Sequence, residues 1–148
     1  MSNQRGEGNR KLLRLAKLLE GITPEQAQVR MPDGQTGFTM SVFVHSCGAP
    51  ACALGWWASA HSKRWKVREN MPVLREIDDP TIHSRPDTAK SAMIEFDISR
   101  AEFDRLFGFF WSCDEAGDNP QKAAAYIRHF VAQRQAQPRR KRNAQPSV

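Results

Sequence analysis

The chain has 148 residues, of which 40% are hydrophobic and 26% charged, and its net charge is +6. This length suits one domain, and the composition excludes a membrane protein or a wholly disordered chain. No run approaches the roughly 18 apolar residues of a membrane-spanning helix, and the N-terminus lacks the features of a secretory signal. Three cysteines, an odd number, indicate a reducing compartment rather than a disulfide scaffold, so a cytoplasmic location is expected.

The positive charge is concentrated at the C-terminus. Residues 137–148 hold four cations, at positions 139–142, and no carboxylate, so residues 1–136 carry only +2. Two prolines and no apolar periodicity predict that this basic tail is disordered. We therefore expect a flexible arm at 1–8, a helical domain at 9–136 and a disordered tail at 137–148.

The first predicted helix combines an apolar stripe with a basic face on the opposite side. After it, Thr23 and Gln26 form the capping box of a short helix that starts at Pro24. Residues 38–44 form either a short strand or an extended entry to the next segment. The stripe is Leu12, Leu15, Ala16 and Leu19, and the basic face is Arg10, Arg14 and Lys17.

The next segment, residues 46–60, has no charged residue. It predicts a buried central helix from Pro50 to Ala60, because a helix that is apolar on all sides is normally interior. Gly55 within it predicts the close approach of another backbone. Residues 63–77 are compatible with a small hairpin, and residues 78–86 are predicted to be a loop.

The second half predicts three further helices. Asp87 caps the first, Ser99 and Glu102 form the capping box of the second, and Asn119 caps the third. The sum is a mainly α, compact, five- to six-helix single domain with at most a small β element. The predicted buried stripes are Ala89, Ala92, Met93 and Phe96; Phe103, Leu106 and Phe107; and Ala123, Tyr126, Ile127, Phe130 and Val131.

One segment resembles a group of uncharacterised proteins encoded mostly by phages and prophages. The segment is Cys47-Gly-Ala-Pro-Ala-Cys52-Ala-Leu-Gly55-Trp56, preceded by Phe38-x-Met40. The group typically has Cys-Gly-Thr, two residues, Cys, two residues and Gly-Trp, whereas this chain has Ala49 in place of the threonine. The resemblance implies a phage or prophage setting in the cytoplasm of a bacterial host, and it implies no activity.

Basic residues interleaved with an aromatic one make the candidate nucleic-acid surface. Lysine and arginine hold phosphates, and an aromatic ring can stack on a base. The alternative is a solvated edge strand protected by its charges. Trp65 and Trp111 are also candidates for anchors of a protein partner. The candidate nucleic-acid-binding residues are Arg10, Arg14, Lys17, Lys63, Arg64, Trp65, Lys66, Arg68, Arg139, Arg140, Lys141 and Arg142.

Two other kinds of site remain open. Cys47, with His45 as its base, would make a thiol-dependent enzyme, although the same cysteine also suits a tight turn into a buried helix. His45, Cys47, Cys52 and Cys113 would hold zinc in an interaction module, with His61 and His83 in reserve, although the usual Cys-x-x-Cys pairs are missing.

The expectation is therefore a small non-enzymatic accessory protein that binds a macromolecule, nucleic acid being slightly favoured over a host or phage protein. No cofactor is expected and no membrane partner. The thiol enzyme and the zinc-stabilised interaction module are the alternatives.

Overall fold

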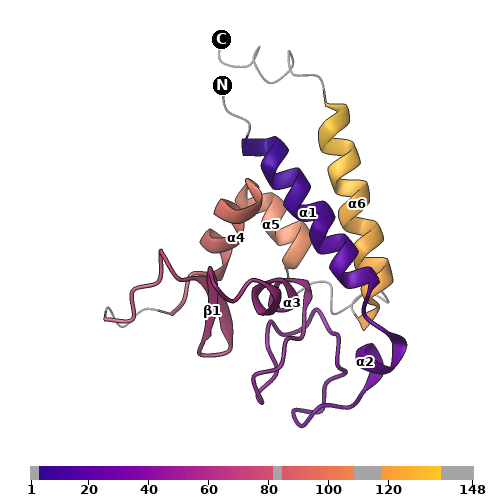
Figure 1. The fold of residues 1–148 in the computed structure, drawn as a ribbon, viewed down its shortest axis with the longest axis vertical. Helices are drawn as coiled ribbons and strands as arrows, with labels where there is room; N and C mark the ends of the chain where they lie inside the picture. Colours follow the sequence, from indigo (N-terminus) through magenta and orange to yellow (C-terminus); the bar gives the residue numbers. More distant parts are fainter. Residues whose placement is uncertain (1–3, 82–84, 109–117, 138–148) are drawn as a thin grey trace.

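The computed structural model describes residues 4–81, 85–108 and 118–137. Within them, six helices and one two-stranded antiparallel sheet confirm the mainly α fold (Figure 1). No helix in this part of the chain has the length and apolarity needed to cross a bilayer. The elements are α1 (Gln4–Glu20), α2 (Pro24–Gln28), α3 (Ala53–Ala60), β1 (Trp65–Arg68), β2 (Met71–Leu74), α4 (Thr88–Phe96), α5 (Arg100–Phe107) and α6 (Pro120–Ala136).

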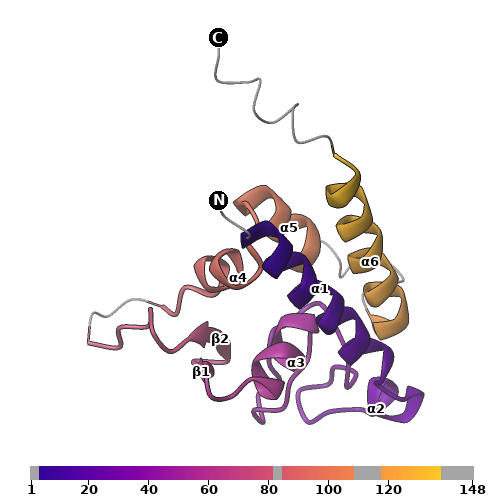
Figure 2. The same cartoon turned by 45° about the horizontal axis from the view of Figure 1, so that its top comes forward.

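The two long helices, α1 and α6, lie side by side and antiparallel (Figures 1 and 2). Arg128 donates two 2.8 Å hydrogen bonds to the carboxylate of Glu20, and the side chain of Gln121 donates to the Ile22 carbonyl at 3.1 Å. The predicted apolar stripe of the first helix is confirmed, because all four of its residues are fully buried. The flexible arm predicted for residues 1–8 is wrong for residues 4–8, which form the first turns of α1.

The predicted helix caps are confirmed. Thr23 and Ser99 each form a complete capping box, with Gln26 and Glu102 respectively. The side chain of Asp87 accepts from the Lys90 amide, and that of Asn119 accepts from two amides of α6. These contacts satisfy backbone donors that have no partner inside the helix, so short polar side chains fix where each helix begins.

The central helix is shorter than predicted. It begins at Ala53, with Cys52 as its N-terminal cap, whereas Pro50 lies before it in an isolated bridge with Val44. The close approach predicted at Gly55 is confirmed, because a Cβ there would lie 2.2 Å from the Phe43 carbonyl oxygen. The backbone of the preceding loop therefore rests directly on α3.

The possible hairpin at residues 63–77 is confirmed as β1 and β2. Its turn is Glu69-Asn70, both with positive φ as a two-residue type I′ turn requires. The outer edge of β2 is covered by α4: Ser91 Oγ accepts from the Leu74 amide at 2.9 Å, and Thr88 Oγ1 donates to the Pro72 carbonyl at 2.7 Å. The hairpin is thus fixed against the helical body. Residues 38–44 form no strand.

Two predicted stripes differ from the observed faces. Helix α4 buries Thr88, Ser91 and Glu95 as well as Ala92 and Phe96, so its inner face is more polar than predicted. On α6, Tyr126 is 37% exposed, so its place in the buried stripe was wrong. Residues 109–117, which include Trp111, and the basic tail beyond Gln137 lie outside the described residues.

Candidate nucleic-acid interface

The basic–aromatic strip at residues 63–68 is not arranged as an open binding surface. Trp65 is fully buried, and its indole nitrogen donates a 2.9 Å hydrogen bond to the carboxylate of Glu95. A ring in that position cannot stack on a base, so the role predicted for Trp65 is wrong, and so is its role as an exposed anchor. Of the four strip cations, Lys63 alone is exposed with no carboxylate partner in the described part of the chain.

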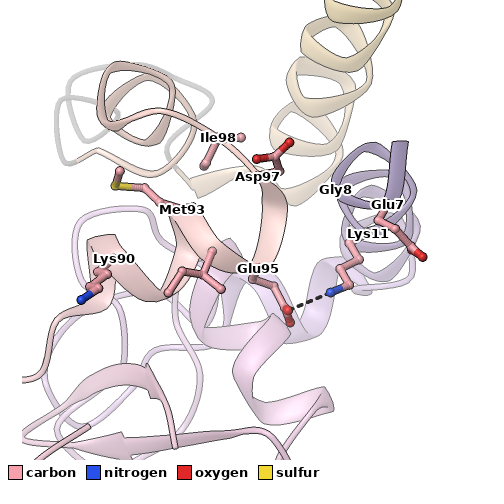
Figure 3. Close-up of a pocket in the computed structure, with 9 residues that line it drawn as sticks. Glu7, Gly8, Lys11, Lys90, Met93, Glu95, Asp97 and Ile98 are labelled. Atoms are coloured by element: carbon pink, nitrogen blue, oxygen red, sulfur yellow. Dashed lines mark hydrogen bonds and ion pairs between the residues drawn. The ribbon is translucent and has the colours of Figure 1, made fainter. Parts of the chain in front are cut away.

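Glu95 collects donors from several separate segments. Its side chain has no exposed surface, and it accepts from Lys11 of α1 at 3.0 Å (Figure 3). It also accepts from Trp57 of α3 at 2.9 Å, from Trp65 of β1 and from Arg64 just before β1. Desolvation by burial works to raise its pKa, but the four donors outweigh it and lower the pKa of Glu95 to about 2. The carboxylate is therefore ionised, and it takes up the charge of Arg64 within the fold.

Asp78 pairs with the two cations at the other end of the strip. Arg68 makes a two-pronged contact with its carboxylate at 2.8 and 2.9 Å, and the Lys66 ammonium lies 3.0 Å from it. The hydrogen bonds from Arg68, followed by those from Lys66, lower the pKa of Asp78 to about 2. Arg64 is therefore paired with α4, and Lys66 and Arg68 with the loop that follows the hairpin, so none of the three stands free for phosphates.

The basic face of α1 is the predicted surface that stays open. Arg10, Arg14 and Lys17 are exposed, and they lie on one side of the helix at i, i+4 and i+7. Arg10 pairs with Glu7 at 3.1 Å, but both side chains are more than half exposed, so the pair is weak and screened by salt. Neither Arg14 nor Lys17 has an ion-pair partner in the described residues. We call these three residues the α1 ridge.

The formal charges of the whole chain are also divided unevenly, between the two long helices with the tail and the remaining residues. Helix α1 carries five cations and two carboxylates, α6 carries three cations and no carboxylate, and residues 137–148 carry four cations and no carboxylate. The rest of the chain carries ten cations and fourteen carboxylates. The two long helices and the tail thus account for +10, against −4 elsewhere. The C-terminus of α6 and the N-terminus of α1 lie at the same end of the helix pair (Figure 1). The tail therefore follows α6 at the end where α1 begins.

The thiol site has the wrong geometry for its base. Cys47 is exposed, whereas His45 is fully buried. Its Nδ1 lies 2.9 Å from an Asp33 carboxylate oxygen and its Nε2 lies 3.1 Å from the Gly37 carbonyl oxygen. Both ring nitrogens are therefore engaged by acceptors, and neither faces Cys47. The contact between His45 and Asp33 instead closes the loop between α2 and α3.

The predicted zinc ligands are not brought together where the structure describes them. Over residues 4–81, 85–108 and 118–137, no three histidine, cysteine or acidic side chains lie close enough to hold an ion. Cys52 is buried at the N-terminus of α3, and burial raises the pKa of its thiol to about 11. His61 is stacked on Trp57, with 3.8 Å between ring centroids. Cys113 and His83 lie outside the described residues.

Glu95 and Asp33 were not predicted from the sequence as functional or structural site residues. Glu95 lies three residues after Ala92 and three before Ile98 on the inner side of an amphipathic helix, and a carboxylate there signals a buried charge that needs partners. Those partners are 30 to 84 residues away, so no local pattern marks them. No protein-family model, no curated protein and no solved structure matches the chain.

Proposed function

We propose that this protein is a small non-enzymatic binding protein whose partner is a nucleic acid. The α1 ridge contacts the phosphate backbone, and the basic tail adds a second, sequence-independent attachment. The resemblance to phage and prophage proteins supplies the setting, an accessory protein in a bacterial cell. The observation that carries the proposal is the separation of charge, +10 on the two long helices and the tail against −4 on the rest.

The spacing of the α1 ridge suits a phosphate backbone. Arg10 and Lys17 are seven residues apart, which is about 10 Å along a helix. Successive phosphates of one strand rise about 3.4 Å along a duplex, so the ridge covers about three of them. Two carboxylates of α1 flank the ridge, Glu7 paired with Arg10 and Glu20 near Lys17, and Glu20 is itself bound by Arg128, so the ridge keeps a positive excess.

The remaining candidate surfaces fit this proposal less well. The cations at 64, 66 and 68 are occupied by buried carboxylates, and a contact through them would first have to break those pairs. The ring nitrogens of His45 are occupied as well, which gives Cys47 no general base. Binding through the exposed α1 ridge requires neither rearrangement, because Arg14 and Lys17 have no ion-pair partner in the described residues and the Arg10–Glu7 pair is exposed.

The test is the salt dependence of binding with and without the tail. Full-length protein and a chain ending at Gln137 are titrated against a fluorescent DNA duplex, an RNA hairpin and a single strand, from about 50 to 300 mM salt. Each phosphate contact contributes about 0.9 to the slope of log affinity against log salt for duplex DNA, so the truncation lowers the slope by about 3 to 4. An affinity that does not change with salt concentration, or no binding to any of the three nucleic acids, contradicts the proposal.

A further inference from the structure

Helix α4 presents an outward face that the fold leaves uncovered. Lys90 and Ile94 are exposed on the side of the helix opposite its buried residues. Met93 beside them is half-buried and packs partly against the core, and the half-buried Asp97 is the left-handed residue that ends the helix. Ile94 is 48% exposed, one of the few large apolar side chains in the described chain that stand open. The face lines an open groove of about 730 Å³ between α4 and the start of α1 (Figure 3).

The groove has an acidic end and a basic end. Asp97 lies beside the start of α1, where its Cβ is 3.2 Å from the position that a Cβ on Gly8 would take, and Glu7 lies on the same rim. Lys90 is at the other end, two helical turns away. Neither Lys90 nor Asp97 has an ion-pair partner among the described residues. Both charges are thus left uncompensated on either side of an apolar centre.

This order of residues is complementary to itself. A two-fold axis placed between Met93 and Ile94 sets two copies of α4 antiparallel. Lys90 of each copy then lies opposite Asp97 of the other copy. Met93 of each copy likewise lies opposite Ile94 of the other. Two-fold interfaces use one patch on both subunits and need this kind of self-complementarity.

We propose that the protein forms a two-fold symmetric homodimer through the outward face of α4. The two apolar pairs lie at the centre and the two Lys90–Asp97 pairs lie at the rim. One helix face and its rim offer an interface at the small end of the range for specific dimers, so the dimer dissociates on dilution. The proposal does not rest on nucleic-acid binding, because the residues that pair in it belong to α4 and its cap, although Glu7, the partner of Arg10, lies on the rim of the same groove.

The test is the mass of the particle in solution as a function of concentration. Light scattering after size exclusion gives twice the 16.8 kDa chain mass at high concentration and the single mass on dilution. Ile94→Arg keeps the protein monomeric at every concentration. Val67→Arg is the matched control, because Val67 is 45% exposed on the hairpin, and it leaves the dimer intact.

Charge reversal tests the pairing itself. Lys90→Asp alone and Asp97→Lys alone each place like charges together twice, and each remains monomeric. An equal mixture of the two variants restores opposite charges at both contacts and forms a heterodimer. Because position 97 has a φ of 52°, circular dichroism checks that Asp97→Lys folds. If Asp97→Lys does not fold, the masses of Ile94→Arg and Lys90→Asp test the dimer in its place. A monomeric wild type, or a dimer that Ile94→Arg leaves intact, overturns the proposal.

Discussion

The indole nitrogen of Trp65 donates a 2.9 Å hydrogen bond to Glu95, which lies 30 residues further along the chain. The same carboxylate binds Trp57, Arg64 and Lys11, so it ties β1, α3 and α1 to α4. A buried carboxylate is unfavourable unless donors surround it, and here four do. The residues that looked like an open binding strip in sequence are for this reason part of the framework.

Removing the charge at the centre of this cluster is predicted to destabilise the fold strongly. Glu95→Gln leaves Lys11 and Arg64 without their carboxylate. Because these side chains are 25% and 45% exposed, water offsets part of the loss, and the expected cost lies below the roughly 3–5 kcal/mol of breaking a fully buried pair. Urea unfolding at neutral pH measures the loss. Glu76→Gln, at an exposed glutamate, is the matched control and changes little. Equal stabilities for the two variants would show that the cluster carries no net stabilisation.

Stability is predicted to fall in acid over a defined range. The pKa of Glu95 and that of Asp78 are both lowered to about 2 in the folded protein, while in the unfolded chain they return to 4.5 and 3.8. Protons therefore bind the unfolded chain more tightly, and the stabilisation is complete above about pH 5 and lost as the pH falls to 2. Urea midpoints between pH 7 and pH 2 measure the slope. Glu95→Gln has a shallower slope, and an unchanged slope would contradict the low pKa.

Replacing Trp65 separates its structural role from the binding role that the sequence suggested. Trp65→Phe keeps an aromatic ring but removes the donor to Glu95, and a hydrogen bond to a charged group contributes about 1.5–3 kcal/mol. We expect lower stability and unchanged nucleic-acid affinity at a temperature where the variant is folded. A large loss of affinity in a stably folded variant would restore the stacking role.

The contact between α3 and the preceding loop is predicted to tolerate no side chain at Gly55. A Cβ would lie 2.2 Å from the Phe43 carbonyl, so Gly55→Ala forces the loop away from the helix and costs about 1–3 kcal/mol or more. Gly21→Ala is the control, because the nearest atom to a Cβ there is at 3.4 Å. Thermal unfolding of the two variants compares them, and a harmless Gly55→Ala would contradict the packing.

Local patterns in the sequence predicted much of the fold. The stripe around Leu12 and Leu15 and the capping box of Ser99 with Glu102 depend on residues within two turns of each other, so sequence spacing determines them. The hairpin could be predicted only as a possibility, because its position depends on side chains of α4 such as Ser91.

The candidate site was harder to predict, because exposure depends on distant residues. Arg14 and Lys17 are exposed as the helical spacing indicated. Arg68 and Arg64 have the same residue type and an equally basic neighbourhood, but Asp78 and Glu95 bind them. Only the fold brings those carboxylates to the strip, so charge patterning alone cannot distinguish a free cation from a paired one.

The most direct test of nucleic-acid binding through α1 compares two double variants, each of which removes two positive charges but from a different part of the surface. Arg14→Gln with Lys17→Gln removes two charges from the α1 ridge, and Lys63→Gln with Arg75→Gln removes two exposed charges beside the hairpin. Duplex DNA titrations over a range of salt are predicted to give a slope lower by about 2 for the first variant and nearly unchanged for the second. Equal slopes for the two variants, or the larger loss at the hairpin, would contradict binding through α1.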